Sequence, residues 1–158
     1  MTPCRVLAFA FILAAGSAPA ADLPGPLKGP VARVVDGETL TLRSAGKLHR
    51  VRLADIDAPE DGQPYHRNAR RMLEKLVGRK TVEVEPVAMA EPGLITGRVS
   101  VYGIEDVGSE MIRQGMAWAY PRDDTNAALI QLEDTARQNR RGLWADSQPP
   151  VPPWQWRR

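Results

Sequence analysis

The chain has 158 residues, 43% of them hydrophobic, which is enough for one domain with one modest core. Its 21 Lys and Arg residues against 19 Asp and Glu residues give a net charge of +2, too weak to indicate nucleic-acid binding by charge alone. Cys4 is the only cysteine, so a mature chain that lacks it has no disulfide, thiolate nucleophile or thiolate metal ligand.

The first twenty residues have the pattern of a secretory signal peptide. Arg5 supplies a positive charge, and Val6–Ala15 forms an apolar run that is too short to cross a bilayer as an anchor. The small residues Ala18 and Ala20 predict cleavage of the signal peptide between Ala20 and Ala21. The loss of Arg5 with the signal peptide lowers the net charge from +2 to +1. We therefore expect a periplasmic or secreted monomer with no stable membrane insertion after cleavage.

Residues 21–30 are rich in proline and glycine and are expected to form a flexible leader before a folded domain at 31–146. In that domain, β-branched residues and alternating polar and apolar residues predict five short strands. The predicted strands are Val31–Val35, Thr39–Leu42, Leu48–Leu53, Thr81–Glu85 and Arg98–Tyr102. Asp36 and Gly37 mark a turn or bulge between the first two strands.

Three helices are also predicted in the domain. Tyr65–Val77 carries one apolar stripe and is followed by Gly78, a residue that often ends a helix. The other two helices are Val107–Gln114 and Asn126–Arg140, and Met116–Tyr120 between them is apolar and extended. The basic residues of the first helix lie mostly off its apolar stripe, and a solvated face explains them better than a phosphate-binding track. These residues are Arg67, Arg70, Arg71 and Lys75.

This order of elements predicts a small α+β barrel. Five short strands with a helix after the third, and further helices towards the C-terminus, suit the OB-fold, a five-stranded Greek-key barrel. We expect such a barrel with about three helices. The Pro- and Trp-rich tail at 147–158 is expected to be polyproline-like or docked through its tryptophans.

Two short segments concentrate acidic residues and arginines. They are Val35–Thr39, with Asp36 and Glu38, and Val51–Glu60, with Arg52, Asp57 and Glu60. The end of a strand beside a loop is a common position for a functional site. Taken singly, Asp36 and Asp57 suit turn residues, and Glu60 suits an exposed acid.

The two segments resemble the paired signatures of the staphylococcal (thermostable, micrococcal) nuclease family. Four further segments resemble motifs of this family in the same order: Thr96–Arg98, Ile112–Ala117, Arg140–Asp146 and the tail Pro152–Arg158. Any one of them is a weak signal. Together they extend over nearly the whole chain from Val31 onward.

The resemblance implies a metal site and a general base. One Ca²⁺ would be held by the carboxylates of Glu38 and Asp57 and by the backbone carbonyl of Ala58, and hard oxygen ligands of this kind suit Ca²⁺. Glu60 matches the general base of the family, which takes a proton from the attacking water.

The resemblance also implies a phosphate site. Arg52 and Arg98 match the two phosphate-binding arginines, whose forked guanidinium groups pair with two phosphate oxygens at once. Asp36 is expected to shape the turn and support the metal site from behind, whereas Asp55 suits a strand-end acid. Tyr120 is the one aromatic residue expected near a bound nucleotide, and the four tryptophans suit packing residues.

The sequence departs from the family pattern at four positions, of which Ala58, in place of a threonine, matters least because its main chain supplies the ligand. Glu38 stands where the family usually has Asp, and a displacement of about 1 Å can cost a catalytic group about a hundredfold in rate. Leu94 and Thr96 stand where members usually carry an acid and a tyrosine. These departures predict weak activity or activity towards a specialised phosphodiester.

Two functional hypotheses follow. The first is an exported Ca²⁺-dependent nuclease that acts on DNA, and on RNA as a further substrate, cleaving on the 5′-oxygen side to leave 3′-phosphates as the family does. The second keeps the barrel without catalysis, as a binding module for nucleic acid, an anionic polymer or a protein. A purely structural envelope protein leaves the order of acids and arginines unexplained.

Overall fold

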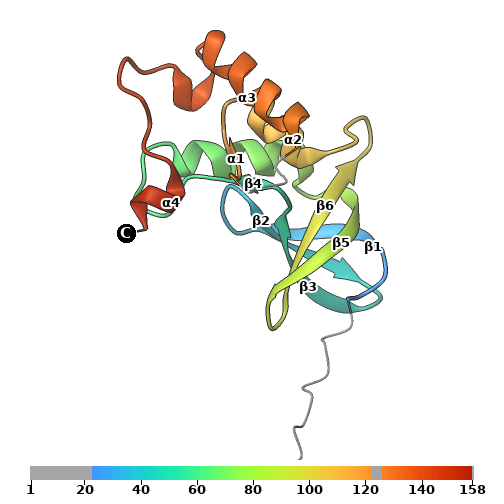
Figure 1. Cartoon of the computed structure of the whole chain (residues 1–158). Helices are drawn as coiled ribbons and strands as arrows, with labels where there is room; N and C mark the ends of the chain where they lie inside the picture. Colours follow the sequence, from blue (N-terminus) through green and yellow to red (C-terminus); the bar gives the residue numbers. More distant parts are fainter. Residues whose placement is uncertain (1–22, 122–125, 158) are drawn as a thin grey trace, which may run out of the picture.

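The alternating segments form a closed five-stranded barrel in the order β1-β2-β3-β6-β5 (Figure 1). Its strands are β1 Leu27–Val34, β2 Thr39–Ser44, β3 Lys47–Leu53, β5 Thr81–Glu91 and β6 Leu94–Val101. Strands β3 and β6 pair in parallel, and the other neighbours pair antiparallel. With the helices described below, the predicted α+β five-stranded barrel is confirmed.

The computed structural model describes residues 23–121 and 126–157. The expected signal peptide and its cleavage site therefore lie outside the described residues. In these two ranges, no helix is both long enough and apolar enough to cross a membrane.

The flexible leader expected at 21–30 is wrong from Leu27 onward, because β1 begins there. Leu27 to Pro30 pair with the first residues of β5, and the second half of β1 pairs with β2. Gly29 serves this closure rather than flexibility: a Cβ at Gly29 would lie 1.9 Å from the carbonyl oxygen of Arg43 in β2. The strand therefore links β2 to β5, and glycine permits its close approach to β2.

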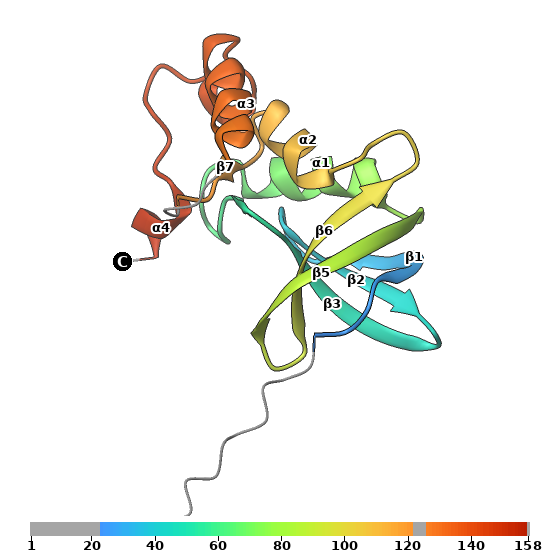
Figure 2. The ribbon, with the colours of Figure 1, turned by 45° about the vertical axis from the view of Figure 1, so that its right-hand side comes forward.

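Helices gather at one end of the barrel (Figures 1 and 2). Helix α1, His66–Val77, confirms the predicted helix and buries its apolar stripe, including Leu73, in the core. Helix α2, Val107–Arg113, contacts α1, β6 and helix α3, Ala127–Gln138. The side chains that are fully buried come from both the barrel and these helices: Leu40, Leu42, Val51, Leu73, Val82, Met111 and Ile112.

A small second sheet joins the chain after β3 to the C-terminal half. Strand β4, Ile56–Asp57, pairs antiparallel with β7, Trp118–Ala119, and Asp57 lies opposite Trp118. The buried carboxylate of Glu133 on α3 accepts a hydrogen bond of 2.7 Å from the amide of Ala119. This contact fixes β7 against α3, and β7 in turn fixes the position of Asp57.

Two glycine-containing motifs meet where α2 ends. The amide of Leu143, in the 3₁₀ helix η1 (Gly142–Trp144), donates a 2.8 Å hydrogen bond to the carbonyl of Gly115. Both Gly115 and Gly142 have positive φ, and a Cβ on either would lie 2.2 Å from a backbone oxygen. The motifs Ile112–Ala117 and Arg140–Asp146 therefore allow two backbone segments to pack closely at these glycines.

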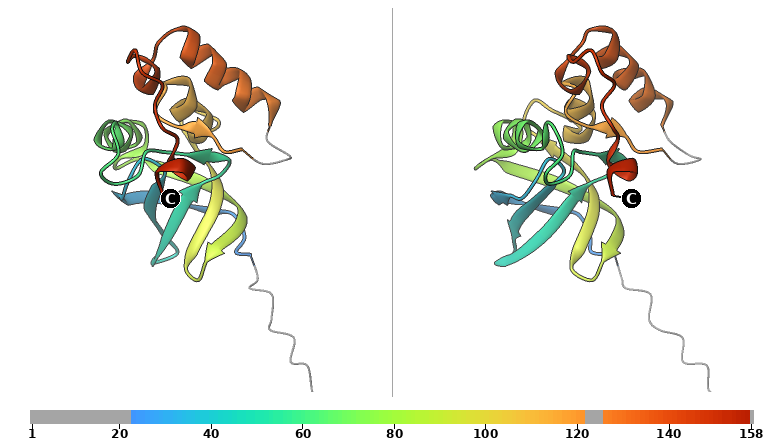
Figure 3. Two further views of the ribbon diagram at one scale, coloured as in Figure 1. Left: turned by 60° about the vertical axis from the view of Figure 1, so that its left-hand side comes forward. Right: turned by 90° about the vertical axis from the view of Figure 1, so that its left-hand side faces the viewer.

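The C-terminal tail returns to the end of the barrel that carries β4 and ends in helix α4, Pro153–Trp156 (Figure 3). The ring of Trp154 makes edge contacts with Trp118 at 6.4 Å and with Tyr120 at 6.3 Å between centroids. The carbonyl of Val151 accepts a 2.5 Å hydrogen bond from the side chain of Gln63. Of the two arrangements expected for the tail, the structure has the one docked through a tryptophan.

Candidate active site

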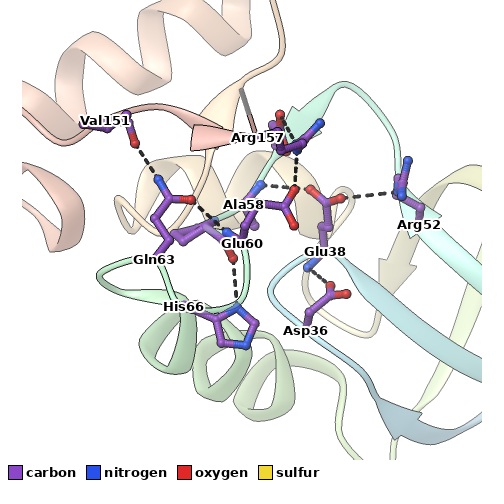
Figure 4. Close-up of polar contacts among 11 residues, drawn as sticks. Asp36, Glu38, Arg52, Ala58, Glu60, Gln63, His66, Val151 and Arg157 are labelled. Atoms are coloured by element: carbon purple, nitrogen blue, oxygen red, sulfur yellow. Dashed lines mark hydrogen bonds and ion pairs between the residues drawn. The ribbon is translucent and has the colours of Figure 1, made fainter. Parts of the chain in front are cut away.

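Glu38, Asp57, Glu60 and Arg52 of the two signature segments meet in a cavity of about 450 Å³. The lining residues come from the turn before β2, from β3, β4 and the loops beside β4, from β5 and β6, from the residue after β7 and from the tail. Figure 4 shows how Glu38, Arg52, Glu60 and Arg157 lie relative to one another. Its charged lining residues are Glu38, Arg52, Asp55, Asp57, Glu60, Glu91 and Arg157. Segments distant in sequence thus supply one charged surface.

Asp36 shapes the turn that presents Glu38. Its Oδ1 accepts hydrogen bonds from the amides of Glu38 at 2.9 Å and Thr39 at 2.7 Å, which is a local turn that aspartate favours. Gly37 follows Asp36 in this turn, which packs closely against the chain. A Cβ at Gly37 would come within 2.8 Å of the Cβ atoms of Ala58 and Ala69. The turn therefore sets where the Glu38 side chain enters the cavity.

Glu38 is held at both carboxylate oxygens. Oε2 accepts a 2.9 Å hydrogen bond from the amide of Ala58, and Oε1 lies 3.3 Å from Nε of Arg52. Burial raises the pKa of Glu38 from 4.5 to about 8; the Ala58 amide opposes this effect and the charge of Asp57 adds to it. A cation beside this carboxyl would favour its charged form.

Asp57 is the most enclosed acid of the cavity, with 3% of the residue exposed. Burial raises its pKa, although the guanidinium of Arg157 acts in the opposite direction. Two carboxyl groups with raised pKa values, Glu38 and Asp57, therefore lie in one enclosed region. Such a pair of hard oxygen donors fits a divalent cation, which would offset the cost of burying both charges.

A cage built from side chains alone is absent from the described ranges, where no three Asp, Glu, His or Cys side chains come together as metal ligands would. The set expected from the sequence needs only two carboxylates and the Ala58 carbonyl. The residues present therefore fit an ion held in part by the backbone.

Arg157 and Glu91 line this site although the sequence did not single them out, and Arg157 is the one that contacts the acids. Its Nη2 lies 2.6 Å and 2.7 Å from the two carboxylate oxygens of Asp57, and its Nε lies 2.5 Å from Oε1 of Glu60. Nothing in the spacing of the tail places its penultimate arginine across the barrel end, about 100 residues from these acids in the chain. The family-like tail was the only signal that pointed to this segment.

Glu60 is positioned by its own loop. Its amide donates a 2.8 Å hydrogen bond to the side chain of Gln63, and its carbonyl accepts one from the amide of Gln63 at 3.0 Å. The neighbouring Pro59 carbonyl lies 3.0 Å from Nδ1 of His66 at the start of α1. Gln63 also holds the tail through Val151, so the loop and the tail share one anchor.

The two arginines matched to phosphate binding differ in position. Arg52 lines the cavity from β3, opposite Thr96 of β6. Arg98 does not line this cavity; its Nη2 lies 3.3 Å from Oδ2 of Asp55, which does. Asp55, expected to be an ordinary strand-end acid, thus joins Arg98 to the edge of the site.

Tyr120 lines the cavity beside the acids and is 37% exposed. Its amide donates to the carbonyl of Asp55, which ties the residue after β7 to the end of β3. The structure therefore places Tyr120 at the candidate site. Its contact with a nucleotide stays a prediction.

Comparisons with known proteins agree with this geometry. A sequence profile described as "Staphylococcal nuclease homologue" matches residues 50–146. An Escherichia coli protein named "Uncharacterized endonuclease" is 42% identical over 131 residues, covering 83% of this chain and 85% of that protein. "Micrococcal nuclease" of Shigella flexneri is 36% identical over 141 residues, covering 83% of this chain and 80% of the relative.

A closed five-stranded barrel with acids and arginines gathered at one end defines a class of barrel proteins with a nuclease-like site. The profile match spans more than half of the chain, and relatives at 36% and 42% identity are matched over most of their length. The chain belongs to the staphylococcal nuclease family.

Proposed function

We propose that this protein is a Ca²⁺-dependent nuclease that hydrolyses phosphodiester bonds of DNA and, as a further substrate, RNA. The observation that carries the proposal is the meeting of Glu38, Asp57, Glu60 and Arg52 in one cavity. Family membership supports nuclease chemistry, and relatives carry the names endonuclease and micrococcal nuclease. The calcium requirement and the residue roles belong to the proposal.

Glu38, Asp57 and the carbonyl of Ala58 would hold the ion. When bound, Ca²⁺ would supply positive charge to the phosphate oxygens as negative charge gathers on them. Burial disfavours the charged forms of Glu38 and Asp57, and a bound cation would offset that cost. Asp36 supports this arrangement through the turn that presents Glu38.

The remaining chemistry falls to Glu60 and Arg52. The carboxylate of Glu60 takes a proton from a water molecule, whose oxygen forms a bond to phosphorus as the bond to the 5′-oxygen breaks. The guanidinium of Arg52 binds phosphate oxygens and stabilises the charge that develops on them. Arg98, at the edge of the site through Asp55, would bind phosphate at a more exposed position.

The test is cleavage of single-stranded DNA by the mature protein with Ca²⁺ and then with a chelator. We expect cleavage that requires Ca²⁺ and falls by about a hundredfold or more in Glu60→Gln. Glu105→Gln is the matched control, because Glu105 is exposed before α2 and lines none of the cavity. Cleavage that persists in the chelator, or equal rates for Glu60→Gln and the control, would overturn the proposal.

One observation favours the alternative, a barrel that binds nucleic acid, an anionic polymer or a protein without catalysis. Both oxygens of Glu38 already have partners within the protein, at Ala58 and Arg52. Calorimetry with Ca²⁺ separates the two functions, because a binding module of this kind needs no metal site. A Glu38→Asp variant that gains strong nuclease activity would identify a weakened enzyme.

A further inference from the structure

The C-terminal tail places a positive charge on the acids that the proposed function assigns to the cation and to the base. Arg157 contacts both oxygens of Asp57 at 2.6 Å and 2.7 Å, and it contacts Glu60 at 2.5 Å (Figure 4). The guanidinium spans the two acids, with Nη2 on Asp57 and Nε on Glu60, and charge-assisted hydrogen bonds of this kind are stronger than neutral ones. The carboxylate of Asp57 has 4% of its side-chain surface exposed, so little water competes for it.

We propose that the Arg157 guanidinium is a resident counter-ion that sets the cation affinity of the active site. It pairs with Asp57 and Glu60 until a divalent cation displaces it from Asp57. This proposal rests on the proposed function, because it takes Asp57 to be a cation ligand. It adds a residue from the tail to the site, and it means that a divalent cation binds by replacing the guanidinium on Asp57.

The tail is built to deliver this side chain. Trp154 packs against Trp118 and Tyr120, and Gln63 holds the carbonyl of Val151. Prolines before α4 restrict the freedom of the unbound tail, which lowers the entropy lost when it docks. Arg157 then follows the last residue of α4, within reach of the cavity.

Displacement of Arg157 needs only a local movement. The Arg157 side chain is 47% exposed, so one side of it already faces water. The anchors at Trp154 and Val151 lie before it in the chain and can stay in place when the guanidinium leaves. Because the same guanidinium contacts Glu60, its departure also frees the proposed general base.

Competition between two cations for one carboxylate has a reciprocal effect. Each weakens the binding of the other by the same factor, and coupling between such sites is commonly about 5- to 150-fold. Removal of the guanidinium should therefore tighten Ca²⁺ binding. Ca²⁺ should in turn loosen the end of the tail.

The first experiment measures Ca²⁺ affinity by calorimetry in the mature protein, without substrate, for the native protein and Arg157→Gln. We expect about fivefold or tighter binding in Arg157→Gln. Arg113→Gln is the matched control, because Arg113 pairs with Glu110 on α2. The affinity of this control should stay at the native value.

A second measurement covers the case in which Arg157→Gln does not fold. Hydrogen exchange of the native protein with and without Ca²⁺ should show lower protection at the amides of Gln155, Trp156 and Arg157, which follow the Trp154 anchor, when Ca²⁺ is bound. Ca²⁺ binding of equal or weaker affinity in folded Arg157→Gln overturns the counter-ion role and leaves the proposed function standing. Absence of Ca²⁺ binding in both proteins overturns the counter-ion role and the calcium requirement together, whereas binding by Arg157→Gln alone supports both.

Discussion

Glu38 combines a buried carboxyl with a position next to a second acid. The pKa of Glu38 is about 8 in the folded protein, above the ordinary value of 4.5. At pH values between these two, the folded protein therefore keeps a proton on Glu38 that the unfolded chain releases. Without a cation, the free energy of unfolding should therefore fall as pH rises from about 5 to 8. The slope should approach about 1.4 kcal/mol per pH unit.

Urea unfolding at pH 5 to 8.5 in a chelator measures this slope. Glu38→Gln, which cannot ionise, should show a smaller slope, with the remaining part arising from Asp57, whose pKa is also raised. A slope that is the same in Glu38→Gln would show that Glu38 is not the group that titrates.

Arg52 is the arginine best placed to act on phosphate in the cavity. Its Nε is buried and makes no hydrogen bond, although it lies 3.3 Å from Glu38, so the guanidinium is not fully satisfied within the protein. A lysine supplies charge but not a planar fork. We expect Arg52→Lys to lower the Ca²⁺-dependent cleavage rate by about a hundredfold.

Rates on one oligonucleotide, with melting curves to check folding, test this expectation. Arg50→Lys is the control, because Arg50 is exposed on the same strand, β3, and does not line the cavity. Similar rates for Arg52→Lys and Arg50→Lys would remove Arg52 from the chemistry.

Helix α1 carries a basic surface next to the site. Arg67, Arg70 and Arg71 line a hollow of about 670 Å³ together with Arg33 of β1, so the arginines come from two elements. His66, at the start of the helix, lines a smaller hollow that also contains Glu38 and Glu60. A nucleic-acid strand leaving the site along this surface is a hypothesis to be tested against the solvated face favoured by the sequence.

We expect Arg70→Glu with Arg71→Glu to weaken binding of single-stranded DNA and to reduce the salt dependence of that binding, by about 0.7 in slope for each phosphate that the variant no longer neutralises. Binding is measured in the Glu60→Gln background so that no cleavage occurs. Arg43→Glu with Lys47→Glu makes the same charge change near the β2–β3 hairpin and should have a smaller effect. An equal drop in affinity for both pairs would favour the solvated face.

Among the helices and strands, the spacing of apolar residues correctly predicted those that depend on local sequence. The stripe that ends at Val77 predicted α1 because apolar residues at helical spacing must share one face. The start of β1 was not predictable, because Gly29 and Pro30 resemble a leader until their partners in β2 and β5 are known. Such pairings depend on distant segments, which local composition does not report.

In the whole molecule, the site also depends on contacts between distant segments, which local sequence does not reveal. Asp57 and Glu60 are close in sequence, and their grouping with Glu38 followed from family order. Arg157 comes from the far end of the chain, and the docking of the tail through Trp154 and Val151 brings it there. Tertiary packing therefore completes the site with a residue that pattern alone left unassigned.

Ca²⁺ should stabilise the folded molecule, because the acids that hold it come together only on folding. A ligand that binds only the folded state adds RT ln(1 + [L]/Kd), about 2.7 kcal/mol at a hundredfold excess over Kd. Melting curves of the mature protein should therefore shift upward by several degrees with Ca²⁺ and return to the starting value with a chelator. Asp57→Asn should lose this shift, because an amide is a weaker ligand and carries no charge. The shift should survive in Glu60→Gln, since Glu60 is assigned to the water and not to the ion. An equal shift in Asp57→Asn would place the ion elsewhere in the molecule.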